Sequence, residues 1–544
     1  MIHSRETAHK CLVNNKTDKN DSHTHDQSTP SAEKTSRTPS KDRTNRSFNA
    51  LFPYIDYNRF GMEWVDIVDE IEWVNRHINV EPRNYEVPFD IGNGTLGQTS
   101  VFKTRATLQS DKNIYKGTFI RISIVTFDDN GRSRNKGGDF FSARMSNDYL
   151  QKSTAGRVID HGNGTYSVYF YAAWAGKARI TIALTFVREF IHYIKDSLKT
   201  KEQLLEFTGT YLDKNVTEET TCRLINEGVW SDMCEYTNQN SIGKTVLVCN
   251  KPKNIDCSKL YSMSVLAVRL NSLAASEIIR TKSLFDRKTD RVVLQGMPMA
   301  VTIQDSTIDS PKLPNCGPDL PIPLSDGYWD NNRTYISKVC RSQQWTQEQF
   351  DKCAANKIFV GSGDSALREF IDIFKEFNSH FDFHFMTPRI AGPHISIWEP
   401  MFESDIIDNI SQSDCRLHNY VVLLNFCFHY GAWSTRSFVE RLVQVKLSVE
   451  RLMKRCRDPK IVIKMSHSRD NVYIEQQIHS NNWSFYDMNR IIRRVFGGIG
   501  VHFLDIWDMV ISSFHDITVH MDRDVVMQEF YLMLSYICPE LVES

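Results

Sequence analysis

The chain lacks the features that mark several large classes of protein. No stretch of its 544 residues comes close to the ~18 uninterrupted apolar residues of a membrane-spanning helix. The first residues, MIHSRETAHKCLVNN, have no apolar core of the kind that a secretory signal carries. Lys plus Arg number 65 and Asp plus Glu number 66, so there is no basic surplus to bind nucleic acid. We therefore expect neither a membrane span nor a nucleic-acid partner.

The chain also lacks C-x-x-C pairs, so we expect no zinc cluster and no other metal site. It does contain 12 cysteines, 11 of them after residue 200, together with N-x-S/T sequons. This combination favours an oxidising, secretory environment, and the alternative is a cytosolic protein with reduced thiols. The candidate glycosylation sites are Asn93, Asn163, Asn215, Asn332, Asn409 and Asn482. Because no signal is visible, either the true N-terminus is missing or the secretory interpretation is wrong.

Eleven cysteines after residue 200 cannot all pair with one another. One of them is therefore free or bonds outside this region, for instance with Cys11. Cys427 is our candidate for the free thiol, because it lies in the apolar run YVVLLNFCF and unpaired cysteine often packs as a small hydrophobe. The connectivity of the others cannot be deduced from their spacing.

Composition sets three regions apart from the predicted folded domains. Residues 1–47 are Ser, Thr, Lys, Asp and Asn with almost no apolar side chain, which predicts a disordered tail. Residues 48–97 mix aromatic and acidic side chains and predict a linker with a helical segment. Residues 201–345 are rich in cysteine and show no clear period, so we expect a loop-rich connector held by disulfides.

Residues 98–200 show a period of two. The stretch FIRISIVTF places Ile120, Ile122 and Ile124 on one face, and the following DDNG reads as a turn. NGTYSVYFYAAWAGKARITIALT repeats this pattern of strand, glycine-containing break and strand. We expect an immunoglobulin-like β-sandwich.

Residues 346–544 alternate apolar strands with amphipathic helices. KIFVG, YVVLLNFCF, IVIKM and VHFLDIWDM read as strands, and a helical stripe such as Leu442, Val445, Val449 and Leu452 lies between them. Four such alternations predict a parallel, doubly wound α/β sheet. Ligands bind such sheets at the carboxyl ends of the strands, so the polar residues found there are the candidate site.

Three polar clusters follow the predicted strands. Ser365 in IFVGSGDS is a candidate nucleophile at the start of a helix, with His520 as its general base and Asp516 as the residue that orients His520. The oxyanion would be bound at three positions: Gly361, Gly363 and Asn425. The alternatives stay open at this point. Ser365 is equally well explained as a helix N-cap, Asn425 as a partner for strand-end backbone groups, and His520 as a non-catalytic histidine.

Together these pieces resemble the NXPE family, the neurexophilin and PC-esterase domain proteins. GDS after an apolar strand, with a late Asp/His pair, is similar to the SGNH (GDSL-like) hydrolases. The matching motifs run from about residue 98 to 540 and are KGGDFFSARMS (136–146), NGTYSVYF (163–170), Cys222, Cys234, Cys249, Cys257, the run with Trp329, Cys340 and Cys353, FVGSGDSALREF, FLDIWDM (503–509), TVH (518–520) and LSYIC (534–538).

The resemblance implies a neurexophilin-type immunoglobulin-like domain, a cysteine-rich connector and an SGNH-like α/β domain. It also implies a secreted or Golgi-lumenal protein that adds or removes acyl groups, notably acetyl, on glycans. Carried over, Ser365 corresponds to the nucleophile and His520 to the late histidine, and Asn425 is a looser match to the oxyanion residue. No cofactor is implied for an esterase, whereas a transferase needs an acyl donor such as acetyl-CoA.

The sequence departs from the family pattern in three places. The loop reads GSGDS, with two residues more than the usual strand–GDS arrangement. Asp516 lies four residues before His520 instead of three, and Met521-Asp522 follows where relatives tend to have prolines. Asp505 or Asp508 could supply the acid instead, or the site could be a Ser–His dyad. The competing hypothesis is a catalytically inactive, secreted binding or signalling protein whose β-sandwich binds a cell-surface partner.

Overall fold

A computed structural model describes most of the chain after residue 97. The described residues are 98–109, 113–199, 206–225, 230–236, 245–265, 292–306, 312–318, 320, 322–331, 333–386, 392–396, 402–470 and 480–542. All of them belong to one compact unit, Asp42–Ser544. The predicted disordered tail (1–47) and linker (48–97) lie outside the described residues, as do Asn93 and Asn332.

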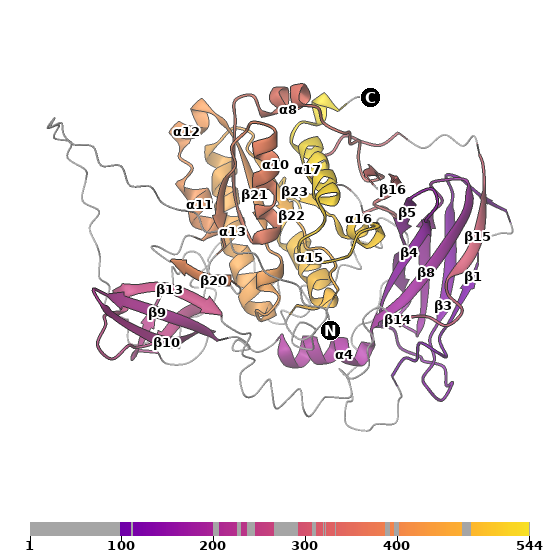
Figure 1. Cartoon of the computed structure of the whole chain (residues 1–544), viewed down its shortest axis with the longest axis horizontal. Helices are drawn as coiled ribbons and strands as arrows, with labels where there is room; N and C mark the ends of the chain where they lie inside the picture. The colour runs from indigo at the N-terminus through magenta and orange to yellow at the C-terminus, as the bar shows by residue number, and fades with distance from the viewer. Residues whose placement is uncertain are drawn as a thin grey trace, which may run out of the picture. The chain divides into compact units, whose positions relative to one another are not determined.

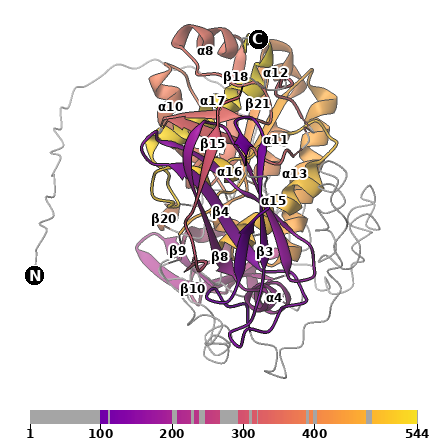
Figure 2. The ribbon, with the colours of Figure 1, turned by 90° about the vertical axis from the view of Figure 1, so that its right-hand side faces the viewer.

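Two sheets contain the strands between residues 105 and 186, and β3, β4, β8 and β15 of these sheets are labelled in Figure 2. The first has four antiparallel strands in the order β1 (Arg105–Leu108), β3 (Phe119–Val125), β7 (Thr165–Tyr171), β6 (Arg157–Asp160). The second has the order β17 (Thr334–Ser337), β16 (Gly327–Asn331), β5 (Lys152–Ala155), β4 (Phe140–Asn147), β8 (Gly176–Phe186), β15 (Met299–Gln304), β2 (Ile114–Tyr115), with β14 (Val292–Val293) also pairing β8.

These two sheets pack face to face around a shared core. The predicted alternation holds in β3, where Ile120, Ile122 and Ile124 are fully buried. They share one apolar cluster with Met145 of β4 and Ile180 of β8, on the facing sheet. Burial of alternate residues from both sheets is the arrangement that a period of two produces.

The segment 201–345 is not the loop-rich connector that we predicted. Its described residues supply β14 to β17 to the second sheet and most of a third sheet. That third sheet has the order β11 (Met233–Glu235), β12 (Val246–Asn250), β10 (Val216–Ile225), β9 (Phe207–Asp213), β13 (Leu260–Val265), β20 (Gly392–Ser396). The hairpin β9–β10 turns at Lys214, whose positive φ of 54° permits a two-residue loop.

The C-terminal part contains a fully parallel sheet, which confirms the predicted α/β domain (Figure 1). Its order is β19 (Asp382–Phe385), β18 (Lys357–Gly363), β21 (Asn419–Asn425), β22 (Lys460–Lys464), β23 (His502–Leu504). The edge strand β19 was not predicted. The predicted strand 501–509 is shorter than expected, because after Leu504 the chain enters a helix.

Helices cover both faces of the parallel sheet, as in a doubly wound fold. One apolar cluster joins the sheet to α11 (Glu403–Asn409), α13 (Thr435–Arg455) and α15 (Asn482–Phe496). Another joins its opposite face to α8 (Gln347–Ala354), α9 (Ser365–Arg368), α10 (Phe370–Glu376), α16 (Trp507–Ser512) and α17 (Arg523–Ile537). Alternate strand residues point to opposite faces, so Val422 joins the first cluster and Val421 the second. Two short helices, α4 (Arg188–His192) and α12 (Gln412–Leu417), complete the set of described α-helices.

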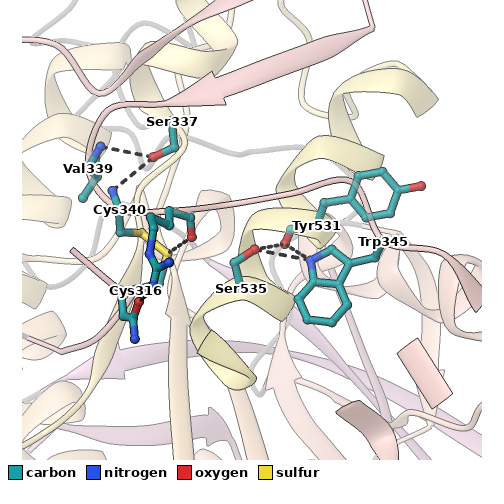
Figure 3. Close-up of a disulfide and its surroundings, with 9 residues drawn as sticks. Cys316, Ser337, Val339, Cys340, Trp345, Tyr531 and Ser535 are labelled. Carbon is teal, nitrogen blue, oxygen red and sulfur yellow. Dashed lines mark hydrogen bonds between the residues drawn. A yellow bond between two sulfur atoms is a disulfide. The ribbon is translucent and has the colours of Figure 1, made fainter. Parts of the chain in front are cut away.

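Five disulfides are formed, and Cys427 is the free cysteine among the described residues, as predicted. The pairs are Cys222–Cys249, Cys234–Cys257, Cys316–Cys340, Cys353–Cys538 and Cys415–Cys456. Figure 3 shows the third of these beside α17. There, the indole of Trp345 donates to the Tyr531 carbonyl oxygen at 3.1 Å and to Ser535 Oγ at 3.3 Å.

Five disulfides fit a secreted or lumenal protein, since they persist in oxidising compartments. None of the helices within the described ranges is both long and apolar enough to span a bilayer.

Candidate functional site

The parallel sheet places its polar strand ends at a switch point. From β18 the chain first leads to β19 on one side, and the next parallel strand, β21, pairs on the other side of β18. In open α/β sheets the crevice at such a reversal is the usual ligand site. The first residue after β18 is Asp364, the last residue of β21 is Asn425, and the last of β22 is Lys464. The candidate site therefore begins at the turn that carries Ser365.

This turn is capped by Asp364 and not by Ser365. The Asp364 side chain accepts a hydrogen bond from the Ala366 backbone N–H at 2.9 Å, and Ser365 is the first residue of α9. Asp364 is fully buried, whereas Ser365 is half-buried. The structure thus removes the simple N-cap explanation of Ser365, because the capping function is already filled by its neighbour.

The side chain of His520 is paired with a carboxylate from the helical turn that begins at Ser365. Its Nδ1 lies 2.8 Å from Oε1 of Glu369, and Glu369 follows Ser365 by four residues, with the Glu369 N–H donating to the Ser365 carbonyl oxygen. Side chains four residues apart share one face of a helical turn. The His520 ring is therefore held through Nδ1 beside the turn that carries Ser365.

The electrostatics of this pair suit a general base. The hydrogen bond to Glu369 raises the pKa of His520, although partial burial of the ring opposes the shift. Half of the His520 side chain is exposed, compared with 21% of the Glu369 side chain. If Nδ1 carries the proton that binds Glu369, Nε2 is the basic nitrogen. This is the tautomer that a serine nucleophile requires.

A buried histidine holds the loop that carries His520. His467, three residues beyond β22, is 1% exposed, and its Nε2 lies 3.1 Å from the Thr518 carbonyl oxygen. Burial lowers the pKa of His467 to about 3, so the ring is neutral near pH 7 and donates from Nε2. The Asp470 N–H also donates to the Ile517 carbonyl oxygen at 2.8 Å. His467 and Asp470, which both follow β22, therefore hold the loop at Thr518 and Ile517.

The predicted oxyanion residues are placed unequally. Gly361 lies inside β18, paired with Leu423 on one side and Phe383 on the other, so it belongs to the sheet interior. Gly363 ends the strand, and a Cβ there would lie 2.8 Å from the Asn425 Cβ. The absence of a side chain at Gly363 thus lets the ends of β18 and β21 come together.

Asn425 already has a structural partner. Its side chain is completely buried and Nδ2 donates to the Lys464 carbonyl oxygen at 3.0 Å, which bridges the ends of β21 and β22. As a partner for a strand-end backbone group, Asn425 therefore uses one of its amide protons. Its Oδ1 has no hydrogen-bond partner in the described part of the chain. An oxyanion-binding role for Asn425 stays a prediction.

The three predicted acids lie away from His520. Asp516 is exposed, and within the described residues no ion pair joins it to His520. Asp505 pairs with Arg493 at 2.7 Å, and Asp508 lies 3.4 Å from Arg157. The acid that contacts the histidine is Glu369, a residue that was not predicted.

A buried ion pair supports the Ser365 turn from beneath. Lys464 Nζ donates to the Ala366 carbonyl oxygen at 2.8 Å and lies 2.6 Å from Glu529 of α17. Both side chains are at most 2% exposed. Helix α17 follows the His520 loop directly, so this pair connects the turn that carries Ser365 with the helix beyond His520.

The free thiol and the sequons have clear environments. Burial raises the pKa of Cys427 well above its ordinary value, so the thiol is protonated and inert near pH 7. Among the sequons, Asn163, Asn215 and Asn409 are exposed. Asn482 is only 1% exposed and accepts a hydrogen bond from the Arg469 N–H, so the prediction that it carries a glycan is not supported: the folded chain leaves no room for one.

Nothing in the described residues groups three or more His, Cys, Asp or Glu side chains so that they could hold a metal ion. At the switch point the structure pairs His520 with Glu369, four residues after Ser365, and no hydrogen bond joins Ser365 to His520 among the described residues.

The architecture defines a protein with an N-terminal β-rich part and a C-terminal parallel α/β part. A family model for neurexophilin matches residues 100–270. A second model, the C-terminal domain of proteins like NXPE family member 4, matches residues 375–538. On these two matches the chain belongs to the NXPE family. The second match includes Asp516 and His520 and begins after Ser365 and Glu369.

Proposed function

We propose that the chain is a secretory-pathway acyl-ester enzyme, an acetyl esterase or O-acetyltransferase that acts on glycans through Ser365. The observation that carries the proposal is the 2.8 Å contact between His520 Nδ1 and Glu369, four residues after Ser365 on one helical turn. A hydroxyl becomes a nucleophile when a nearby base accepts its proton, and the base works best when a third group orients it.

The reaction would proceed in two balanced steps. Ser365 Oγ attacks the acyl carbonyl carbon while His520 Nε2 takes the hydroxyl proton, and the tetrahedral intermediate expels the alcohol, which leaves with that proton. Attack of water on the acyl-enzyme then releases a carboxylic acid and restores Ser365. If a sugar hydroxyl attacks instead, the acyl group is transferred, and the acyl donor in that case is a thioester such as acetyl-CoA. Glu369 stays ionised throughout and stabilises the imidazolium that forms in the tetrahedral intermediate of each step.

A second candidate is a catalytically inactive neurexophilin-like binding or signalling protein. The match of residues 100–270 to neurexophilin supports it, as does the lack of a hydrogen bond between Ser365 and His520 in the described part of the chain. In this case the β-rich part would bind a cell-surface protein and the α/β part would be a scaffold. The immunoglobulin-like nature of the β-rich part belongs to this proposal.

Labelling with a fluorophosphonate probe separates the two candidates. The protein is secreted from eukaryotic cells so that its disulfides form, and wild type is compared with Ser365→Ala. We expect labelling of wild type alone. Absence of labelling in a protein shown to be folded by circular dichroism and gel filtration would overturn the enzyme proposal and leave the binding protein.

A further inference from the structure

A cavity lies at the carboxyl end of β23, away from Ser365. Its volume is about 110 Å³, whereas one water needs about 10–15 Å³, so it can hold a single ring-sized molecule. Two stretches singled out in the sequence meet there. KGGDFFSARMS supplies residues 139–143 to the wall, and FLDIWDM supplies Trp507 and Asp508. Neither stretch takes part in the Ser365 site.

One wall of the cavity is aromatic. The ring centroids of Phe140 and Tyr486 lie 5.4 Å apart, and those of Tyr486 and Trp507 lie 5.5 Å apart. Phe140 and Tyr486 are partly exposed, so the cavity reaches solvent on this side. Aromatic walls of this kind bind the apolar C–H face of a ligand while its polar edge points elsewhere.

Two other lining residues, Arg157 and Asn482, carry buried donors without partners among the described residues. Arg157 Nη2 lies 2.7 Å from Asp326 and 3.4 Å from Asp508, while its Nε is buried and makes no hydrogen bond to any described residue. Asn482 is 1% exposed; its Oδ1 accepts from the Arg469 N–H at 2.7 Å. The Asn482 Nδ2 is buried and likewise lacks a partner in the described chain. Buried donors in a cavity wall predict a ligand with acceptor atoms.

Three carboxylates, Asp139, Asp160 and Asp508, also line the cavity, and each already accepts a hydrogen bond within the chain. They supply acceptors and repel an anionic ligand, whereas the Arg157 guanidinium repels a cation. The ligand that satisfies all of these walls is uncharged, donates and accepts hydrogen bonds, and has an apolar face. A pyranose ring has these properties, since its hydroxyls both donate and accept and its axial C–H bonds form an apolar surface.

We infer that this cavity binds one uncharged sugar ring, with Asn482 and Arg157 as donors and Phe140, Tyr486 and Trp507 as the apolar wall. The sugar site does not require Ser365 to be a nucleophile. The two sites lie on the same edge of the parallel sheet, because Ser468, which lines the cavity, is the neighbour of His467, which holds the His520 loop. Binding of a glycan here would place other parts of that glycan along the edge towards Ser365.

Titration of the secreted wild-type protein with methyl glycosides tests this inference. The probes are methyl β-D-galactopyranoside, methyl α-D-mannopyranoside and methyl 2-acetamido-2-deoxy-β-D-glucopyranoside, with methyl β-D-glucuronide and glucosamine as charged comparisons. Saturation-transfer NMR detects binding and calorimetry gives its strength. We expect saturable binding of at least one neutral glycoside, and binding of both charged sugars weaker by about tenfold or more.

Asn482→Asp is the diagnostic variant. It keeps the oxygen that accepts from Arg469 and removes the Nδ2 donor, and a carboxylate is tolerated at the start of α15. We expect at least about tenfold weaker binding of the neutral glycoside. Asn481→Asp is the matched control, because Asn481 is the N-cap of the same helix and does not line the cavity; its binding should stay within about twofold of wild type.

Two results would overturn the inference. One is that none of the three neutral glycosides binds to folded wild type at tens of millimolar, roughly the weak limit for a single ring. The other is that Asn482→Asp and Tyr486→Ala, both folded, bind as wild type does. Fluorophosphonate labelling of the same preparation reports on Ser365 separately, so failure of the proposed reaction and failure of the sugar site are distinguishable.

Discussion

At one edge of the parallel sheet, the ends of β18 and β21 differ from the end of β23 in how exposed their polar side chains are. At β18 and β21, the reactive groups are accessible: Ser365 is half-buried and half of the His520 side chain is exposed, held by a single contact to Glu369. At β23, Arg157 is fixed between two carboxylates, and Asp508 is only 6% exposed. The exposed side chains at the ends of β18 and β21 can be reached by a reacting group. The buried side chains at the end of β23 can only bind a ligand whose shape and hydrogen-bonding groups match theirs. Rigidity beside Ser365 comes from beneath the surface, from Lys464 and Glu529.

Replacing Glu369 should have the largest effect. Glu369→Gln keeps the shape of the side chain but removes the charge that orients His520 and stabilises its protonated form. We expect the rate of fluorophosphonate labelling of Ser365 to fall by as much as about 10⁴-fold, with the fold intact. The measurement is the labelling time course of the purified variant.

Glu376→Gln is the control for this prediction, since Glu376 lies on α10 and pairs with Arg523 away from Ser365. It should label at the wild-type rate. If Glu369→Gln labels as fast as Glu376→Gln, then Glu369 has no orienting role and the ends of β18 and β21 are not organised as we describe.

Removing Lys464 should combine a loss of stability with a loss of reactivity. Lys464→Met leaves Glu529 buried without its cation, which costs about 3–5 kcal/mol of the free energy of unfolding. It also removes the hydrogen bond to the Ala366 carbonyl oxygen beside Ser365. We expect a lower midpoint in urea and slower labelling by the molecules that stay folded.

Arg441→Met is the matched control. Arg441 pairs with Glu403 at 2.7 Å, both side chains are fully buried, and the pair joins α13 to α11 on the other face of the sheet. We expect a similar loss of stability but a normal labelling rate per folded molecule. Equal labelling rates in the two variants would show that Lys464 contributes to the fold alone.

The pH dependence of labelling should follow His520. The base must be neutral, so labelling is lost as the pH falls through the pKa of His520. Because Glu369 raises this pKa, the midpoint should lie above the ordinary value of about 6.5. In Glu369→Gln the midpoint should move down. The contribution of the His520–Glu369 ion pair to folding stability has the opposite pH dependence. It is present below the pKa that His520 has in the unfolded chain, and it is lost as the pH rises through the higher pKa of His520 in the folded protein. A midpoint that Glu369→Gln leaves in place would argue against this pairing.

The smallest effect is expected at Asp516. Asp516→Asn changes an exposed side chain that does not contact His520 in the described structure, so stability should stay within about 0.5 kcal/mol. Labelling should stay within about twofold. A much larger loss of labelling would show that Asp516 replaces Glu369 beside His520 during the reaction.

The sequence predicts the α/β part well where burial alone decides the structure. β18, β21 and β22 were identified because strands covered by helices on both faces are continuous apolar runs. The β19 sequence DFHF was missed, since an edge strand of four partly exposed residues carries no such run. The predicted strand 501–509 is strand only over His502–Leu504, and its last residues, from Trp507, are helical. There the Asp505 side chain accepts from the Trp507 N–H at 3.1 Å and helps to start α16.

The candidate site could be predicted only in part. Ser365 and His520 were found from a motif and a helix boundary, and their elements are where they were expected. Glu369 was not predicted, because the family pattern has its acid just before the histidine, whereas this carboxylate comes four residues after Ser365 on the same helical turn. The sugar cavity is lined by residues between 139 and 511, and no local sequence pattern predicts that such distant segments come into contact.

The Cys353–Cys538 disulfide sets an order of events during synthesis. The other four pairs span 23 to 41 residues and can close soon after each segment emerges. Cys353 has to wait for 185 further residues, which contain α9, the parallel strands after β18 and the His520 loop. When this bond closes, it joins α8 to the end of α17 around a completed sheet. A cell that monitors unpaired thiols could therefore detect, at Cys353, whether the whole α/β domain has been made and folded.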